Sequence, residues 1–277
     1  MIVVNYDAFL PEDRDTLLKS LTEQCKNGRL LIYSQNIPHE DLGVLFGVYG
    51  LTNLLAHNIN QDSDEFLVTI QKIIQNDIFG IKKYFSWASK QKNYEILSTH
   101  DAREFIEEAK QFAKEVGIPS RLAESYVIVA DELVMNAVYN APTDKKSEPR
   151  YADMARSQEV VLDVDEKIEA VLCYDGHRLG ISVADSFGSL RANKVTNYLA
   201  KCFRNGEQQV SWDTGGAGLG LYQAYNALSH FVINLSCNKR TEIIGIVDVR
   251  GSYRDFIKRG KSFNIFVENQ RRNNGYG

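Results

Sequence analysis

The chain has 277 residues, of which 44% are hydrophobic and 25% charged, as expected for a folded globular protein of one or two domains. The formal net charge is −4, so the composition gives no electrostatic reason to expect binding to nucleic acid or to a membrane surface. The N-terminus turns acidic at once and lacks the basic and apolar regions of a signal peptide, and we expect a cytoplasmic protein.

Short strands and helices alternate through residues 1–77. The expected strands are Ile2–Asn5, Leu30–Tyr33 and Leu51–Ala56, and the expected helices are Arg14–Cys25, Asp41–Tyr49 and Asp64–Ile74. This order is typical of a parallel sheet covered by helices, which predicts a small α/β domain. Residues 78–97 follow as a connector. Because they are too apolar for a free linker, we expect them to pack between the two halves of the chain.

Residues 98–269 begin with two predicted helices. The first starts near Asp101, its expected N-cap, and the second spans Ser120–Ala141, where a proline stops it. Asp175-Gly176 then indicates a hairpin. The remaining expected elements are a helix near 193–203, a helix that follows a glycine cluster and ends near 229, a second hairpin over 231–249 and a last strand over 262–267. Residues 270–277 are polar, and we expect a disordered tail.

The second helix carries a polar ridge. Glu132, Asn136 and Asn140 are four residues apart, so they stack along one side of the helix beside its apolar face. Buried amides and carboxylates are costly unless they are paired, and a divalent cation with phosphates is one partner that suits oxygen ligands. A carboxylate one turn away could orient a water or hydroxyl as a general base. The alternative is an ordinary amphipathic helix with polar residues at its rim.

Asp185 ends an apolar strand, and Gly188 follows three residues later. A carboxylate at a strand end can accept a hydrogen bond from an amino group, such as the exocyclic amine of adenine, and the glycine would let a flat ring approach the backbone. The alternative is a simple strand-ending turn, because Asp and Gly are common in such turns.

Four glycines lie within the six residues from Gly215 to Gly220. Their backbone N–H groups can point at an anion, and the helix that follows presents its positive end to the same place. The segment lacks the Lys-Ser/Thr pair of a Walker loop and the later acidic residue of a dinucleotide fingerprint. The alternative is a flexible glycine turn.

Taken in order, these motifs resemble those of the GHKL superfamily, which includes the ATPases of gyrase, heat-shock chaperone, histidine-kinase and mismatch-repair type. The resemblance covers roughly residues 98–269, and it is closest to the ATPase domains of anti-sigma-factor serine kinases, which also begin with a helix such as Asp101–Val116. It implies a two-layer α/β sandwich of the Bergerat type, in which helices cover a mixed sheet. It also implies ATP and Mg²⁺ as ligands.

The resemblance further implies a role for each motif residue. Glu132 would be the general base, Asn136 the magnesium ligand and Asn140 a nearby phosphate or metal contact. The residues implied to contact the nucleotide are Asp185, Gly188 and Thr241 at the adenine and Gly216, Gly218, Leu219 and Gly220 at the phosphates. Residues 189–214 would form a mobile lid, and its basic side chains are either solvated or within reach of a phosphate: Arg191, Lys194, Lys201 and Arg204.

The sequence departs from the family pattern at two positions. Phe187 stands where the first glycine of the family's D-x-G-x-G pattern is expected, which implies an adenine pocket of a different shape. Asn140 stands where the family commonly has a histidine or a charged residue, so the side chain at this position would assist phosphoryl transfer to a different extent than in the family.

Residues 1–77 resemble the later half of a response-regulator receiver domain, truncated so that the early strands with their acidic pair are missing. His57 stands where that domain would have a lysine, so we expect Asp7 not to be phosphorylated. We also expect His100 to be a helix-start residue rather than a phosphoacceptor. The region would then serve as a docking or dimerisation module.

Two functions from different classes are consistent with these motifs. The first is an ATP-dependent regulatory kinase of the histidine-kinase-like or anti-sigma class, which would transfer the γ-phosphoryl of ATP to a partner protein. The second is a non-catalytic module in which ATP orders the lid and changes partner affinity. A third option, a scaffold with a dead ATPase fold, predicts no ATP binding. A homodimer is compatible with each of them.

Overall fold

The computed structural model describes residues 1–25, 29–35, 37–56, 63–205 and 217–268. They form one nine-stranded mixed sheet in the order β1-β2-β3-β9-β7-β8-β6-β5-β4. The strands are β1 (Ile2–Asn5), β2 (Leu30–Tyr33), β3 (Asn53–Leu55), β4 (Lys90–Ile96), β5 (Ile168–Tyr174), β6 (Arg178–Asp185), β7 (His230–Ser236), β8 (Arg240–Asp248) and β9 (Ser262–Val267). The helices are α1 (Arg14–Gln24), α2 (His39–Gly47), α3 (Ser63–Gln75), α4 (Thr99–Glu115), α5 (Ser120–Tyr139), α6 (Ala192–Asn205), α8 (Ala217–Ala227) and α9 (Tyr253–Lys258), with 3-10 turns η1 (Tyr6–Ala8), η2 (Ile81–Tyr84) and η3 (Val164–Glu166).

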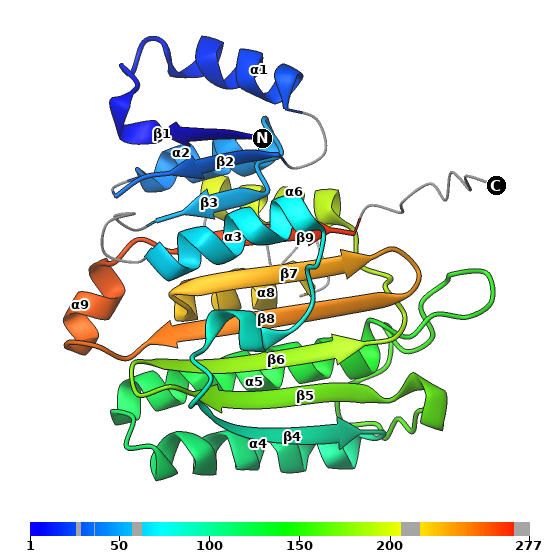
Figure 1. The fold of residues 1–277 in the computed structure, drawn as a ribbon. Coiled ribbons are helices and arrows are strands. Elements are labelled where there is room, and N and C mark those ends of the chain that lie inside the picture. The colour runs from blue at the N-terminus through cyan, green and yellow to red at the C-terminus, as the bar shows by residue number, and fades with distance from the viewer. Residues whose placement is uncertain (26–28, 36, 57–62, 206–216, 269–277) are drawn as a thin grey trace, which may run out of the picture.

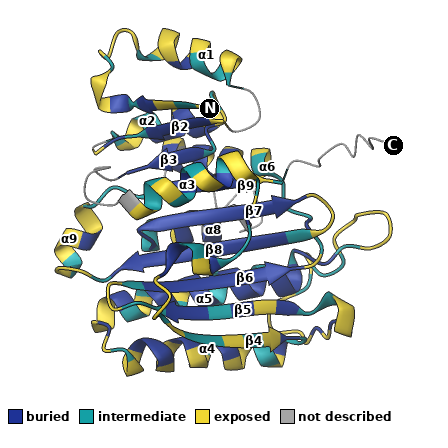
Figure 2. Cartoon of the chain, in the orientation of Figure 1, coloured by how far each residue is buried: buried dark blue, intermediate teal, exposed yellow. Residues whose placement is uncertain are grey.

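Helices cover both faces of the sheet. Helices α4, α5, α6 and α8 lie on one face, while α3 and the segment through η2 cross the other (Figure 1). The central strands are buried along almost their whole length (Figure 2), because both faces are covered and their side chains are largely β-branched or aromatic. The predicted α/β class with a mixed, helix-covered sheet is therefore confirmed. Within the described residues, no helix is both long and apolar enough to cross a bilayer.

The first three strands pair in parallel, as their alternation with helices predicts. Ile2 pairs with Leu30 in β2, and Ile32 pairs with Leu54 in β3. Strand β3 then pairs antiparallel with β9, where Leu54 lies opposite Phe263. The N-terminal strands therefore extend the same sheet to which the C-terminal strands belong.

One hydrophobic core also joins the two parts of the chain. Phe46 on α2 is fully buried, and its ring centroid lies 5.8 Å from that of Phe203 on α6 and 5.0 Å from that of Phe263 on β9. Tyr225 on α8 completes the group, 5.5 Å from Phe203. The described parts of residues 1–77 and 98–269 therefore share a core.

The predicted connector, residues 78–97, contains two different structures. Its first part, with Ile78, Ile81 and Phe85, packs on the sheet against β5, β7, β8 and β9, so it covers one face of the C-terminal strands rather than lying between the two halves. Its second part is strand β4, which pairs antiparallel with β5 at the edge of the sheet. This strand escaped prediction because an edge strand with one exposed face is mostly polar: the segment reads Lys-Gln-Lys-Asn-Tyr-Glu-Ile.

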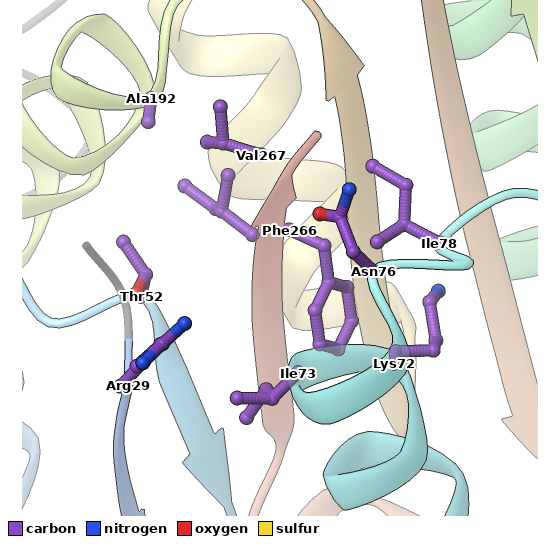
Figure 3. Close-up of a pocket in the computed structure, with 10 residues that line it drawn as sticks. Arg29, Thr52, Lys72, Ile73, Asn76, Ile78, Ala192, Phe266 and Val267 are labelled. Atoms are coloured by element: carbon purple, nitrogen blue, oxygen red, sulfur yellow. The ribbon is translucent and has the colours of Figure 1, made fainter. Parts of the chain in front are cut away.

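A buried lysine helps to fix α3 on the sheet. Lys72 is 1% exposed, and its Nζ donates to Tyr84 Oη at 3.0 Å and to Asn234 Oδ1 at 2.8 Å. Burial lowers the pKa of Lys72 to about 7. The side chain also lines a cavity of about 290 Å³ between α3 and β9, with Phe266 in its wall and Arg29 on the far side (Figure 3).

The start of α4 differs by one turn from the sequence-based expectation. Ser98, not Asp101, is the N-cap, and its side chain accepts a hydrogen bond from the backbone N of Asp101 at 3.2 Å. The Asp101 carboxylate instead accepts from the backbone N of Leu97 at 2.9 Å. Both residue types suit a helix start, and the correct assignment of Ser98 follows the preference for serine at the cap with an acidic residue three positions later.

Candidate functional site

Helix α5 runs in the same direction as strand β6. Helix α4 runs antiparallel to β4, because Tyr94 contacts Phe105 near the helix start while Lys90 lies over Phe112 near its end. Helix α5 reverses the chain after α4, and the two antiparallel pairings from β4 to β5 and from β5 to β6 bring β6 back to the direction of β4. The C-terminal ends of α5 and β6 therefore point to the same edge of the sheet (Figure 1).

A hydrogen bond sets the level of the helix on the strand. Tyr126 Oη donates to the carbonyl of Gly180 at 2.9 Å. From that point Asn136 lies about 15 Å further along the helix, at about 1.5 Å per residue. Asp185 lies about 16 Å further along the strand, at about 3.3 Å per residue. The polar ridge of α5 and the aspartate at the end of β6 therefore reach the same edge of the sheet.

The three polar residues of α5 form a hydrogen-bonded ladder. Asn136 Nδ2 donates to Glu132 Oε1 at 2.6 Å, and Asn140 Nδ2 donates to Asn136 Oδ1 at 2.6 Å. The ridge predicted from the four-residue spacing is thus present, and its members are paired with one another. A magnesium ion at Asn136 Oδ1 would share this oxygen with the amide of Asn140 or displace that amide.

The Glu132 carboxylate is largely buried and has a second partner. Its side chain is 12% exposed, and Arg156 NH2 lies 3.3 Å from Oε2. Burial raises the pKa of Glu132, while the hydrogen bond from Asn136 and the charge of Arg156 oppose that rise. Arg156 belongs to the polar loop after α5, and no sequence pattern singles it out.

The glycine cluster meets this carboxylate. A Cβ placed on Gly220, in the first turn of α8, would overlap the carboxyl group of Glu132. Only glycine therefore fits between the two helices at this position. Gly218 and Leu219 belong to the same first turn, whose leading backbone amides have no acceptor within the helix. Gly216 lies outside the described residues.

Asp185 is buried at the end of β6, with its carboxylate held by the backbone that follows. Oδ1 accepts hydrogen bonds from the backbone N of Phe187 at 2.9 Å and of Gly188 at 3.0 Å. Burial raises the pKa of Asp185 to about 6, although the hydrogen bonds from the backbone of Gly188 and Phe187 lower it. A buried carboxylate of this kind is stabilised when an amino group donates a hydrogen bond to it.

Thr241 lies directly opposite Asp185 in the β6–β8 ladder. Its hydroxyl is buried and has no hydrogen-bond partner of acceptable geometry among the described residues. A buried hydroxyl without a partner costs free energy that a ligand or a bound water could recover. The resemblance implied that Asp185 and Thr241 contact the same ligand, and the register of the β6–β8 ladder makes them neighbours.

Gly188 is required by the fold itself. Its φ is +57°, and a Cβ there would lie 2.5 Å from the backbone N of Lys239 in the turn between β7 and β8. The carbonyl of Gly188 also accepts from the backbone N of Asn238 at 3.0 Å. The glycine thus binds the end of β6 to the β7–β8 turn, which accounts for its presence without a ligand.

Phe187, the departure from the family pattern, is half-buried and lies under a guanidinium. Arg150 Cζ is 5.8 Å from the centre of the Phe187 ring and 5.0 Å from that of Tyr151. Arg150 is itself fixed by Glu166 at 2.7 Å. The loop after α5 therefore closes over the end of β6 through Arg150, as it closes over Glu132 through Arg156.

The basic residues of the expected lid have different partners. Arg191 donates to the carbonyl of Gly188 and to Asn238 Oδ1, each at 2.7 Å, so it fixes the turn before α6. Arg204 packs against α2, since a Cβ on Gly43 would lie 2.9 Å from its Cγ. Lys194 and Lys201 are exposed on α6. None of these contacts involves Glu132 or Asp185.

The acidic and imidazole residues of the N-terminal half lie elsewhere. The Asp7 carboxylate accepts from Ser34 Oγ and, at 2.9 Å, from the backbone N of Gln35. His57 lies outside the described residues. His100 is exposed in the first turn of α4, 3.2 Å from Glu104, as expected for a helix-start residue.

The donor set at this edge of the sheet suits a magnesium ion only together with a ligand that supplies further oxygens. No group of three or more His, Cys, Asp or Glu side chains in the described part of the chain could hold a metal ion. Glu132 and Asn136 offer two oxygen donors on adjacent turns, and Mg²⁺ is commonly held by one or two protein oxygens plus substrate phosphates. The residues present thus fit a magnesium–phosphate group rather than an isolated metal site.

No protein-family model matches this chain, and no curated protein matches it significantly.

Proposed function

We propose that the chain binds Mg-ATP at the edge of the sheet where α5, α8 and the end of β6 meet, and that it transfers the γ-phosphoryl group to a partner protein in signalling. The observation that carries this proposal is the contact between Gly220 and Glu132. It joins the carboxylate ridge to the glycine cluster, two motifs that lie almost 90 residues apart in the sequence, and both are of the kind found in GHKL ATPases.

The adenine would lie over the end of β6. Asp185 would accept a hydrogen bond from its amino group. The hydroxyl of Thr241, which has no partner within the described part of the chain, would supply the second polar contact, directly or through a water. Phe187 would give this pocket an aromatic wall in place of a glycine. The fold proposed for residues 98–269 is accordingly the Bergerat-type sandwich, with residues 1–77 as a truncated receiver-like docking or dimerisation module.

The phosphates would lie between α5 and the start of α8. The backbone amides that begin α8, for which no carbonyl within that helix is an acceptor, would favour an anion there. Mg²⁺ would neutralise charge on the phosphates as they transfer, with Asn136 as its protein ligand. Glu132 would hold the proton of the attacking hydroxyl, since burial raises the pKa of its carboxyl toward the working pH.

A second candidate function is a nucleotide-binding switch without transfer, and the ion pair between Arg156 and Glu132 favours it. A general base that is held by a guanidinium at 3.3 Å is less available to a substrate hydroxyl. In that case bound ATP would act by changing the affinity for a partner, without phosphoryl transfer.

An assay with γ-labelled ATP separates these functions. Glu132→Gln keeps the size of the side chain against Gly220 and removes the base. The matched control is Asp131→Asn, whose carboxylate is adjacent in sequence, 49% exposed and 3.9 Å from Arg156. Turnover that is lost in Glu132→Gln and kept in Asp131→Asn supports transfer. ATP binding without turnover in the wild type supports the switch, and failure of the wild type to bind ATP contradicts both.

A further inference from the structure

A cavity of about 340 Å³ lies at the opposite edge of the sheet from Asp185. Strands β6, β7 and β9 run in one direction, and the cavity adjoins the start of β9, whereas Asp185 ends β6. The C-terminal end of α8 reaches it through Tyr225 and Asn226. The described residues that line it are Gln35, Ile37, His39, Leu42, Leu54, Ala56, Phe203, Tyr225, Asn226, Ile257, Lys258, Arg259, Gly260 and Lys261.

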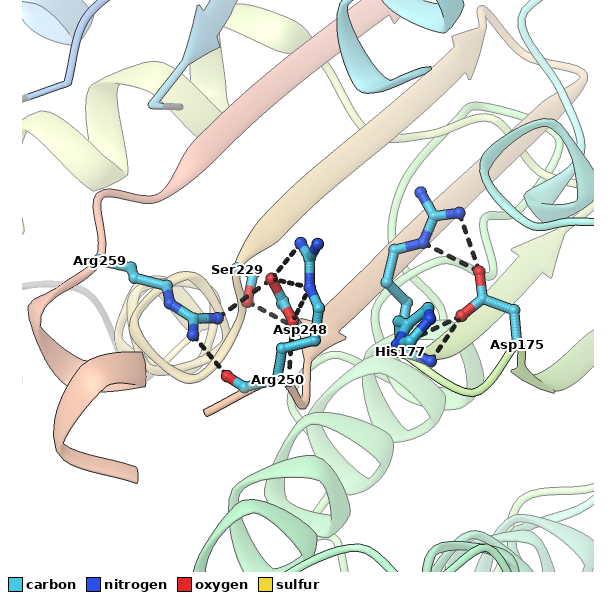
Figure 4. A network of polar contacts seen from close by, with 7 residues as sticks. Asp175, His177, Ser229, Asp248, Arg250 and Arg259 are labelled. Carbon is cyan, nitrogen blue, oxygen red and sulfur yellow. Dashed lines mark hydrogen bonds and ion pairs between the residues drawn. The ribbon is translucent and has the colours of Figure 1, made fainter. Parts of the chain in front are cut away.

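The lining is basic. It contains His39, Lys258, Arg259 and Lys261, and none of the described lining residues is an aspartate or glutamate. The Arg259 guanidinium is already held by Asp248, at 3.1 Å, and by the carbonyl of Arg250 (Figure 4). The charges left to the cavity are therefore those of the two lysines, with His39 at the rim.

Lys261 has unused hydrogen-bonding capacity. Its Nζ donates to the carbonyl of Leu228 at 2.8 Å and lies 4.3 Å from the centre of the Phe256 ring. An ammonium group has three N–H donors, and this bond uses one of them. Burial lowers the pKa of Lys261 to about 8, and no carboxylate among the described residues contributes to that shift.

Three acidic residues from neighbouring segments are directed to other partners. Asp7, beside Gln35, is bound by Ser34 and by the backbone of Gln35, and Asp248 is bound by Arg250 and Arg259. Asp255 accepts from Ser252 at the start of α9 and lies near Lys258. A half-buried cation without a carboxylate partner is costly unless a ligand neutralises it.

The remaining wall of the cavity is aromatic. The ring of His39 meets that of Phe203 edge to face with centroids 4.8 Å apart, and Phe203 meets Tyr225 in the same way at 5.5 Å. Such a wall accommodates a flat, apolar body. Gln35 at the rim and Asn226 add neutral polar groups.

We infer that this cavity binds a small organic phosphate, with its phosphate group against Lys261 and Lys258 and an aromatic body against Phe203 and Tyr225. The cavity volume lies in the range of small-molecule sites, about 300–1,000 Å³. Lysine ammonium groups act as point charges that suit a phosphate, whereas bidentate recognition of a carboxylate favours a free arginine. The site is separate from the proposed nucleotide site, and the inference does not depend on it.

Calorimetric titration of the full chain with phenyl phosphate, inorganic phosphate and benzoate tests this inference. We expect phenyl phosphate to bind more tightly than either of the other two, because only phenyl phosphate supplies both the charge and the ring. Lys261→Met, which keeps the length of the side chain, should weaken phenyl phosphate at least about tenfold, the loss of one charge-assisted hydrogen bond. Lys110→Met on α4, where the lysine is exposed and pairs with Glu107, is the control and should leave binding unchanged.

Lys258→Ala provides a test that does not depend on the folding of the Lys261 variant. Its exposed side chain can be removed without disturbing the core, and we expect phenyl phosphate to bind about two- to fivefold more weakly. Three results would overturn the inference: a Kd weaker than about 1 mM for phenyl phosphate, equal binding of benzoate, or a loss of binding in Asp185→Asn as large as that in Lys261→Met. The last result would mean that the titrant occupies the other edge of the sheet.

Discussion

The backbone of Gly220 lies directly against the carboxylate of Glu132, with no room for a Cβ between them. This contact places the start of α8 beside the polar ridge of α5. It also restrains the Glu132 side chain, whose Oε1 accepts a hydrogen bond from Asn136 Nδ2, so the carboxylate is held by packing and by a hydrogen bond together.

Substitution of Gly220 by alanine should displace Glu132 or α8. The added methyl group overlaps the carboxyl group, and we expect a loss of about 1–3 kcal/mol in the free energy of unfolding together with loss of ATP binding. Gln223→Ala, an exposed position on the same helix, is the control and should change neither quantity by more than about 0.5 kcal/mol. Urea unfolding and ATP titration measure the two effects. A Gly220→Ala protein with native stability would show that the two helices are not in contact.

Removal of the buried hydroxyl of Thr241 should affect ATP binding and the stability of the fold differently. Because it has no partner among the described residues, we expect Thr241→Val to be neutral or stabilising in the absence of ligand and to weaken ATP binding about tenfold. Thr69 on α3 has a hydroxyl that is likewise buried and without a partner among the described residues. Thr69→Val should therefore match Thr241→Val in stability but leave the affinity for ATP unchanged. Equal ATP affinities for both variants would argue against a contact between Thr241 and the nucleotide.

The raised pKa of Asp185 predicts a specific pH dependence of stability. The pKa is about 6 in the folded chain and about 4 in an unfolded one. The contribution of this group is therefore fully present below about pH 4 and is lost as the pH rises to about 6. Asparagine does not titrate, so Asp185→Asn should not lose stability as the pH rises. Between about pH 4 and 6 its free energy of unfolding should therefore rise by about 1–3 kcal/mol relative to that of the wild type.

Asp248→Asn is the matched control, with the opposite sign. Burial raises the pKa of Asp248, but hydrogen bonds from Arg250 and the charge of Arg259 outweigh that effect and hold the pKa below its usual value. Its stabilising contribution is therefore present above about pH 4 and lost as the pH falls. Urea unfolding of the three proteins between about pH 3 and 8 gives the comparison, and identical pH slopes for both variants would contradict the assignment.

The shared core predicts that the N-terminal part does not unfold independently. Phe46 is fully buried between Phe203 and Phe263, so Phe46→Ala should cost about 3–5 kcal/mol. Because the two parts share one sheet, calorimetry should show one transition that moves as a whole to lower temperature. A separate early transition for the N-terminal strands, with the rest unchanged, would show that the two parts are energetically independent.

Sequence patterns predict the local features of the site and miss those that depend on tertiary pairing. The ladder from Glu132 to Asn140 follows from helical spacing, which needs no information beyond the segment itself. The pairing of Asp185 with Thr241 depends on the β6–β8 register, since the chain makes α6, α8 and β7 between these strands. The resemblance to a known family predicted their common role, and the spacing of the residues did not.

Arg156 shows why part of the site could not be predicted. It lies in an irregular loop without periodicity, and only the fold of that loop brings its guanidinium to Glu132. The same is true of the pairing of β3 with β9, strands separated by most of the chain. Long-range pairing is set by the sum of many contacts, of which a single segment carries little trace.

Titration of ATP with and without Mg²⁺, on the wild type and on Asn136→Ala, tests the central claim most directly. We predict that Mg²⁺ strengthens ATP binding to the wild type and that this gain is lost in Asn136→Ala, while Asn193→Ala, at the exposed start of α6, behaves as the wild type. Absence of ATP binding to the wild type, or an undiminished effect of Mg²⁺ in Asn136→Ala, would contradict the proposal that the ridge of α5 holds the metal–phosphate group.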